Sequence, residues 1–247
     1  MINFLLFFTL FIIIVVPLIS LLFFRDGGKS IGSPFIMGVL VYIIGIQVLK
    51  TLLFKFIGYL PGDTSIFWGN KWFYGIFMSV TTGICVELIR FFILNIRNKN
   101  KRWSSSVRRN AVMGIGEGWI TATFTWGYFI ATVTINLLTG EDISSYGLTE
   151  YYMIIMIIEK AIALFMYVAL TFIAQYAVKK NKIKNYLILC IAIHSIAEMG
   201  IYFIPYQFNL PLWAGEIFYA CITALTFAYG YILIKSLHSH KVRISEN

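Results

Sequence analysis

Five glutamates and one histidine lie inside long apolar stretches of the sequence, where little water is available to solvate a charge. These residues are Glu87, Glu117, Glu159, Glu198, Glu216 and His194, and the basic residues of the same stretches are Lys50, Lys55, Arg90 and Lys160. A charged side chain that faces lipid costs several kcal/mol. We therefore expect these side chains to face the interior of a helix bundle, pair with one another and surround a shared polar cavity.

Two pairs among these residues have the spacing of neighbours on one helix face. Glu87 and Arg90 are three positions apart, and His194 and Glu198 are four positions apart. A carboxylate held beside a guanidinium in a membrane interior is a candidate general base toward water. The alternative is that Glu87 and Arg90 form a structural ion pair that holds two helices together.

The other charges favour structural interpretations. Glu159 and Lys160 are adjacent in the chain, so their side chains are expected to point apart and to contact other helices. Glu216 lies near the expected start of a helix, where the helix dipole stabilises a carboxylate. Lys50 and Lys55 can extend their ammonium groups along apolar surface toward the membrane boundary.

The composition is that of a polytopic membrane protein. Of 247 residues, 59% are hydrophobic and 13% are charged, with a mean hydropathy of +0.80, whereas soluble domains carry about 25% charged residues. A water-soluble globule, a disordered chain and a disulfide-stapled secreted domain are excluded. Apolar segments of spanning length occur at 3–24, 34–58, 72–96, 110–138, 151–178, 185–205 and 212–234. The predicted fold is an all-α bundle of about seven transmembrane helices, forming a single integral membrane domain over residues 1–247.

The segments between the apolar stretches predict the orientation of the chain. Residues 97–109 and 179–184 contain Lys and Arg but no acid, whereas residues 139–150 contain acids but no base. The positive-inside rule then predicts an outside N-terminus and a cytoplasmic C-terminus in the cell membrane. Because these loops account for much of the net charge of +9, the expected partners are the lipid bilayer and a membrane peptide or protein substrate, and no nucleic acid.

Depth in the membrane follows from a rise of about 1.5 Å per residue. Glu87, Glu117 and His194 are expected to share one layer, and Glu159 and Glu198 to form a second layer just beyond it. The fourth apolar segment is longer than one crossing requires. We expect it to tilt, or to break near Gly114–Gly118, because glycine weakens a helix.

Motifs recur in a defined order along the apolar segments. They are Gln47-Val48-Leu49-Lys50, Gly83-Ile84-Cys85-Val86-Glu87-Leu88-Ile89-Arg90, Gly114-Ile115-Gly116-Glu117-Gly118, Glu159-Lys160-Ala161 and His194-Ser195-Ile196-Ala197-Glu198. This succession resembles the YhfC family of bacterial membrane proteins, a distant relative of the CPBP and PrsW groups of glutamic-type intramembrane proteases. The resemblance implies a peptidase in which Glu87 activates water and histidines stabilise the oxyanion or hold a metal.

The chain departs from the family pattern at several positions. Val86 stands where the family has a first glutamate, and Glu117 and Tyr167 stand where it has histidines. Lys160 replaces an arginine, and Glu198 replaces an aspartate. The site predicted from the residues and the resemblance together consists of Glu87, Arg90, His194, Glu198, Glu117 and Glu159. A divalent metal could be held by His194, Glu117 and Glu87, although their spacing is not diagnostic of a metal site.

Three functions remain open at this point. The first is a glutamic-type intramembrane endopeptidase that cleaves a membrane-bound peptide. The second is a catalytically degenerate relative, a binding or immunity protein that uses the same polar cavity, because two family histidines are replaced. The third is a transporter of a small solute or ion with the glutamates as relays, although the sequence has no inverted-repeat signal.

Overall fold

The computed structural model describes residues 2–23, 32–58, 70–99, 106–140, 146 and 149–245. No β-strand occurs among these residues, which confirms the predicted all-α fold class. The elements are α1 (Ile2–Phe23), α2 (Gly32–Tyr42), η1 (Ile43–Lys50), α3 (Thr51–Gly58), α5 (Lys71–Asn98), α6 (Val107–Ala122), η2 (Thr123–Gly127), α7 (Tyr128–Leu138), α8 (Glu150–Lys179), α9 (Ile183–Glu198), η4 (Met199–Phe203), α10 (Ile204–Gln207) and α11 (Leu212–Ser245).

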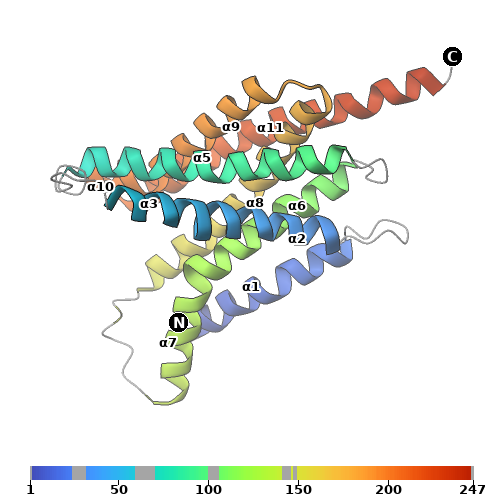
Figure 1. The fold of residues 1–247 in the computed structure, drawn as a ribbon. Coiled ribbons are helices and arrows are strands. Elements are labelled where there is room, and N and C mark those ends of the chain that lie inside the picture. Colours follow the sequence, from blue (N-terminus) through green and yellow to red (C-terminus); the bar gives the residue numbers. More distant parts are fainter. Residues whose placement is uncertain are drawn as a thin grey trace.

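Helices run through each of the apolar ranges that the sequence delimits. Four described helices are long and apolar enough to cross a membrane: Gly32–Ile57, Trp72–Asn98, Glu150–Lys179 and Leu212–Leu237. The start of α1 and the end of α11 lie at opposite ends of the bundle (Figure 1). The count of seven spans and the orientation of the termini remain predictions.

Polar caps determine where three of the site-bearing helices begin. The Asn70 side chain accepts hydrogen bonds from the backbone N–H groups of Trp72 and Phe73 at the start of α5. Ser106 caps α6 and Thr149 caps α8 in the same way. Such caps satisfy N–H groups that have no partner inside the helix, and they help to define the register of the residues that follow.

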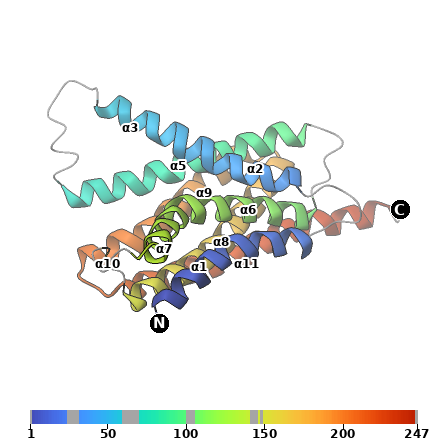
Figure 2. The ribbon, with the colours of Figure 1, turned by 90° about the horizontal axis from the view of Figure 1, so that it is seen from below.

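Helix α8 is the central element of the bundle. It packs against α6, α9 and α11, while α6 also packs against α2, and α5 packs against α9 and η1. Figure 2 shows this arrangement from below, with α11 extending past the other helices at its C-terminal end. The packing brings together α5, α6, α8 and α9, which carry all the residues of the predicted site.

The glycines of α6 serve close helix packing. A Cβ atom added at Gly114 would lie 2.5 Å from the Val168 Cα of α8, and Gly116 faces the backbone of Phe35 in α2. Small residues let helix backbones approach closely in membranes. The expected break near Gly114–Gly118 is wrong, because α6 continues as a regular helix to Ala122 and the irregularity is the π-helix η2 that follows. Packing on two sides supports the helix where glycine alone would weaken it.

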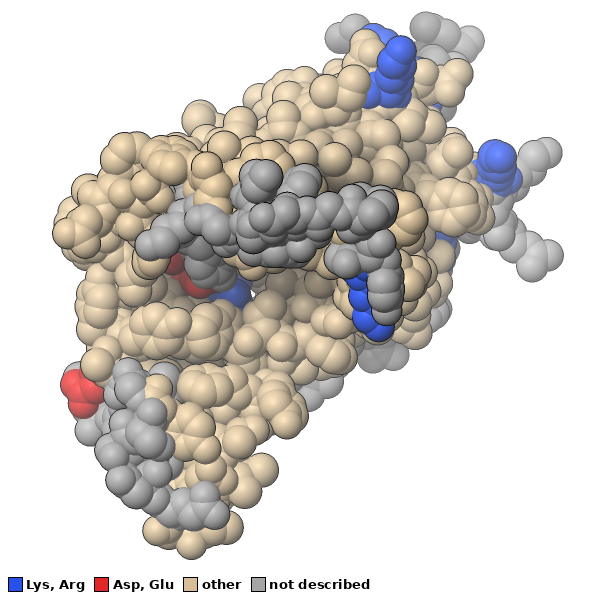
Figure 3. Space-filling view, turned by 60° about the vertical axis from the view of Figure 1, so that its left-hand side comes forward, with Lys and Arg blue, Asp and Glu red and all other residues tan. Residues whose placement is uncertain are grey.

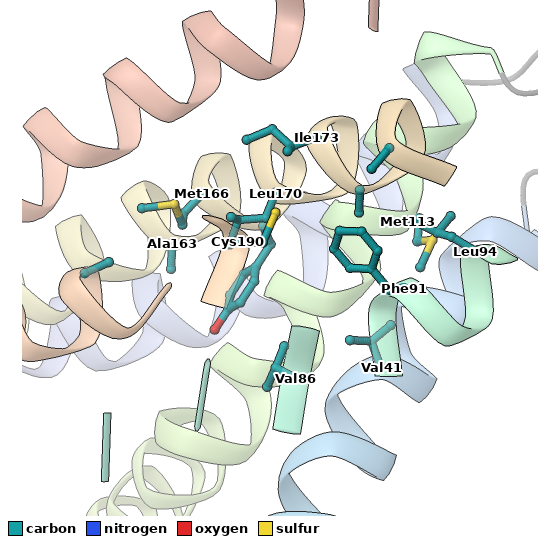
Figure 4. Packing of buried hydrophobic residues seen from close by; sticks show 14 of the residues in the cluster. Val41, Val86, Phe91, Leu94, Met113, Ala163, Met166, Leu170, Ile173 and Cys190 are labelled. Carbon is teal, nitrogen blue, oxygen red and sulfur yellow. The ribbon is translucent and has the colours of Figure 1, made fainter. Parts of the chain in front are cut away.

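An apolar cluster lies where α2, α5, α6, α8 and α9 meet, as Figure 4 shows. Val86 and Phe91 of α5, Leu170 of α8 and Cys190 of α9 are at most 3% exposed. Val86 directly precedes Glu87 in the chain, and Cys190 lies one turn before His194. The cluster therefore restrains the helices from which the polar side chains project.

Segments of π-helix follow α2, α6 and α9. They are η1, η2 and η4. π-Helical turns are rare and occur frequently at functional sites. No feature of the sequence predicted them.

Candidate active site

Arg90 is the centre of a buried polar network. Its Nη1 atom donates to Glu87 Oε2 at 2.9 Å, and its Nη2 and Nε atoms donate to the two oxygens of Glu117 at 2.6 and 3.3 Å. Arg90 and Glu87 are 0% exposed and Glu117 is 1% exposed. The guanidinium fork matches a carboxylate with two parallel hydrogen bonds. One arginine thus links two acids from α5 and α6, as the expectation of inward-facing, paired charges required.

His194 joins this network from α9. Its Nδ1 atom lies 2.8 Å from Glu87 Oε1, and its side chain is 4% exposed. Because Glu87 already accepts from Arg90, we assign Glu87 as the acceptor here as well, which places the proton on Nδ1. The Nε2 atom of a neutral His194 then carries a lone pair. Glu87, Glu117 and His194, which were expected to share one layer, belong to one network: Arg90 joins the two glutamates, and His194 contacts Glu87.

Glu198 lies at the edge of this network. Its Oε1 atom is 3.9 Å from His194 Nε2, a separation too long for a direct hydrogen bond. The Glu198 side chain is 29% exposed, in contrast to the fully buried Glu87. The two atoms are close enough for a single water molecule to contact both.

Glu198 lines a polar cavity of about 150 Å³. The lining residues are Tyr42, Ile46, Lys50, Thr82, Val86, Glu117, Thr121, Thr125, Glu159, Lys160, Ala163, Tyr167, Glu198, Ile201 and Tyr219. In the space-filling view of Figure 3, acidic and basic atoms lie side by side inside a hollow of the molecule. Glu87, Arg90 and His194 are not part of this lining and lie behind it. The predicted water-activating residue Glu87 therefore does not face the cavity, whereas Glu198 does.

Glu159 and Lys160 differ from the expectation that they point apart. Lys160 Nζ lies 2.5 Å from Glu159 Oε1, and both residues line the cavity. The long lysine stem lets adjacent side chains meet, and the shortage of water in the bundle favours pairing. Lys160 Nζ also lies 5.9 Å from the centre of the Trp126 ring.

Glu216 lies near the start of α11, as the sequence predicted. It comes just past the first turn, where the effect of the helix dipole falls off, and it is buried. Its Oε2 atom has no hydrogen-bond partner among the described residues. It does not line the polar cavity.

The sequence interpretation missed two cavity residues. Lys50 was expected to extend toward the membrane boundary, but its Nζ atom donates to Thr82 Oγ1 at 2.6 Å and faces the cavity. Tyr167 was considered only as the replacement of a histidine. Its ring centre lies 5.9 Å from that of His194 and 6.0 Å from Arg90 Cζ. One signal in the sequence could have predicted that the Lys50 side chain points inward: Lys50 lies inside its apolar segment and not at its end.

The predicted metal ligands do not fit a metal in this arrangement. Glu87 and Glu117 use their oxygens to accept from Arg90 and His194, as the distances above show. Within the described residues, no group of three His, Cys, Asp or Glu side chains is placed to hold a metal ion. The guanidinium of Arg90 occupies the point on which Glu87 and Glu117 converge, and like-charge repulsion opposes a second cation there.

The chain matches a protein-family model. The model described as YhfC intramembrane metalloprotease matches residues 12–207. No curated protein and no solved structure matches the chain. The match covers more than half of the chain, including every residue of the predicted site, and confirms the resemblance seen in the ordered motifs. Together with the apolar helices, it identifies a multi-pass membrane protein.

Proposed function

The chain belongs to the YhfC intramembrane metalloprotease family, and we propose that it is a glutamic-type endopeptidase that cleaves a membrane-bound peptide. The observation that carries this proposal is the continuous polar chain Arg90–Glu87–His194, which ends 3.9 Å from Glu198 at the cavity. Family membership supports a membrane protease. The polar chain supports a reaction carried out by carboxylates and a histidine, without a metal-dependent step.

The side chains divide between positioning and chemistry. Glu87 orients His194 by accepting from Nδ1–H, and Arg90 fixes Glu87, so both act as positioning residues. Glu198 Oε1 and His194 Nε2 are two acceptors that can hold the two hydrogen atoms of one water molecule. The oxygen lone pair of that water is then directed away from both acceptors, toward a peptide carbonyl in the cavity.

The proposed reaction is a hydrolysis with Glu198 as general base. The water oxygen attacks the carbonyl carbon, Glu198 takes one proton, and the carbonyl electron pair moves to the oxygen as an oxyanion. When the oxyanion collapses, the C–N bond breaks and the proton on Glu198 passes to the leaving nitrogen. The products are a carboxylic acid and an amine. General acid–base catalysis of this kind contributes about 10²–10⁴-fold to the rate.

The membrane setting belongs to the same proposal. We infer seven spans in the cell membrane, with the N-terminus outside and the C-terminus cytoplasmic, from the alternation of basic and non-basic loops. The substrate would then reach the cavity within the bilayer. Reporter fusions after Asn98 and after Leu138 should show cytoplasmic and outside locations, respectively.

The proposed function is tested by Glu198→Gln, which keeps the shape and removes the base. With purified protein in lipid vesicles and fluorescein-labelled casein as probe, we expect a loss of about 10²-fold or more in kcat. Glu150→Gln, in the first turn of α8 and outside the cavity lining, is the matched control and should retain activity. Equal rates for Glu198→Gln and the wild type would exclude this mechanism.

The burial of Glu87 favours a second candidate function. Both of its oxygens are engaged and it is 0% exposed, as expected if the polar network only maintains the shape of a binding cavity. A non-catalytic binding or immunity protein would keep its cellular phenotype in the Glu87→Gln and Glu198→Gln variants and lose it on deletion. Equal loss in the variants and the deletion would contradict a non-catalytic role.

A further inference from the structure

The cavity has donors that the proposed mechanism does not yet use. A tetrahedral intermediate needs hydrogen-bond donors directed at its oxyanion, and Glu198 and His194 act as acceptors. At the two positions where the family has histidines, the chain has Glu117, which accepts from Arg90, and Tyr167. An ionised Glu117 cannot donate, so the donor is Tyr167 or another residue of the lining.

The threonine hydroxyls of the lining are already used. Thr82 donates to the backbone carbonyl of Met78 at 2.8 Å, and Thr121 and Thr125 donate to carbonyls one turn earlier in their own helix. Lys160 is paired with Glu159 at 2.5 Å, so an acid already balances its charge. Beside Lys160, the described lining contains two kinds of donor, the ammonium of Lys50 and the hydroxyls of three tyrosines.

Lys50 differs from the tyrosines in charge and in the way it is held. Its Nζ donates to Thr82 Oγ1 at 2.6 Å, and Thr82 can accept because its own proton goes to Met78. An ammonium has three donors, of which this bond uses one. Lys50 takes part in none of the ion pairs found among the described residues, although Glu198 lines the same cavity.

The π-helix η1 explains why Lys50 reaches the cavity. Lys50 is its last residue, and Gly45 within η1 packs against Cys85 and Val86 of α5. This contact brings the segment close to the helix that carries Thr82, Glu87 and Arg90. A lysine retained inside a membrane bundle generally marks a functional site.

We propose that Lys50, positioned by Thr82, is the catalytic residue that stabilises the oxyanion. This inference rests on the proposed peptidase function and assigns to one side chain the role that histidines are implied to have in the family. The ammonium balances Glu198 before the reaction and donates to the carbonyl oxygen as negative charge develops on it. A donor that acts mainly in the transition state raises kcat and leaves KM almost unchanged.

The test compares Lys50→Met with Lys55→Met, which removes an exposed lysine of α3 outside the cavity. With fluorescein-labelled casein as the probe, Lys50→Met should lose about 10²–10³-fold in kcat with KM unchanged. Lys55→Met should match the wild type. Lys50→Arg, which keeps the charge, should recover part of the loss.

A second measurement separates catalysis from folding. A peptide phosphinate has an anionic tetrahedral centre that resembles the intermediate, and its binding should weaken in Lys50→Met. Casein that is not cleaved can be studied in the Glu198→Gln background. There, adding Lys50→Met should leave the affinity for casein unchanged. If Lys50→Met does not fold, Thr82→Val, which keeps the charge but releases the ammonium, should lower kcat at constant KM.

Two negative outcomes have different meanings. In the first, the wild type cleaves the probe, Glu198→Gln does not, and Lys50→Met keeps its kcat. This result would overturn the role of Lys50 but not the peptidase function. If Tyr167→Phe lowers kcat and Lys50→Met does not, the role of Lys50 is likewise overturned, and stabilisation of the oxyanion is assigned to Tyr167. A wild type that cleaves none of the probe and binds no phosphinate would overturn the peptidase function together with this inference.

Discussion

Two cavities beside α6 and α8 differ in both size and chemistry. The larger, about 340 Å³, lies between α1, α6 and α8 and has Lys160 as the charged residue of its described lining. The smaller, about 150 Å³, contains Lys50, Glu117, Glu159, Lys160 and Glu198. Of these two cavities, volume alone favours the apolar one, whereas the arrangement of charges favours the smaller one.

Helix periodicity explains how the same two helices line both cavities. On α6, Gly118 and Ala122 face the apolar cavity, whereas Glu117 and Thr121 face the polar one. Residues that are adjacent in a helix point about 100° apart because there are about 3.6 residues per turn. Adjacent residues of one helix can therefore line different cavities, one apolar and one polar. Lys160 lines both cavities.

The largest expected effect is on the buried network behind the polar cavity. Arg90→Met removes the guanidinium that pairs with Glu87 and Glu117 and leaves two buried acids without their cation. Breaking a buried pair by removing one partner costs about 3–5 kcal/mol. The free energy of unfolding in an SDS titration should fall by that amount. The control Arg108→Met, at an exposed position, should leave it unchanged. A similar stability for both variants would contradict the network's structural role.

A smaller effect should distinguish the two cavities directly. Ala163 lines the polar cavity and Ala161, two positions earlier on α8, lines the apolar one. Ala163→Leu should block the polar cavity, abolish casein cleavage and cost about 1–3 kcal/mol through overpacking. Ala161 is exposed, so Ala161→Leu should retain cleavage and stability. If Ala161→Leu abolished cleavage and Ala163→Leu did not, the apolar cavity would be the reaction site.

The smallest expected effect is that of metal removal. Glu87, Glu117 and His194 are engaged with one another and with Arg90, so EDTA or 1,10-phenanthroline should change neither casein cleavage nor the thermal unfolding midpoint. A loss of activity that Zn²⁺ restores would show that the polar residues rearrange around a metal. That result would replace the carboxylate mechanism proposed above.

The sequence predicted the helical ranges and the burial of four of the five glutamates, whereas Glu198 is partly exposed at the cavity. Long apolar segments exclude most alternatives to a helix in a membrane, because only helices and closed barrels satisfy the backbone there. It also placed Glu87 with Arg90, because a spacing of three positions puts two side chains on one helix face. It failed for Glu159 and Lys160, since the assumption that adjacent residues point apart ignores the length of the lysine side chain.

Other features depend on contacts between distant segments. The bond from Lys50 to Thr82 joins residues 32 positions apart, and the bond from Arg90 to Glu117 joins residues 27 positions apart. Neither partner can be inferred from local spacing. The exclusion of Glu87 from the cavity lining likewise depends on how α5 packs against the neighbouring helices.

By itself, the sequence determined that this is a membrane helix protein with ionisable groups inside the bundle, because hydrophobicity and helix period are local properties of the chain. Only the tertiary structure decided that Arg90 joins two acids, that Glu198 faces the cavity in place of Glu87, and that Lys50 turns inward. Those outcomes depend on two close contacts between helices. In the first, α6 approaches α8 at Gly114 and α2 at Gly116, and in the second, η1 packs against α5. Both contacts bring side chains of different helices within hydrogen-bonding distance.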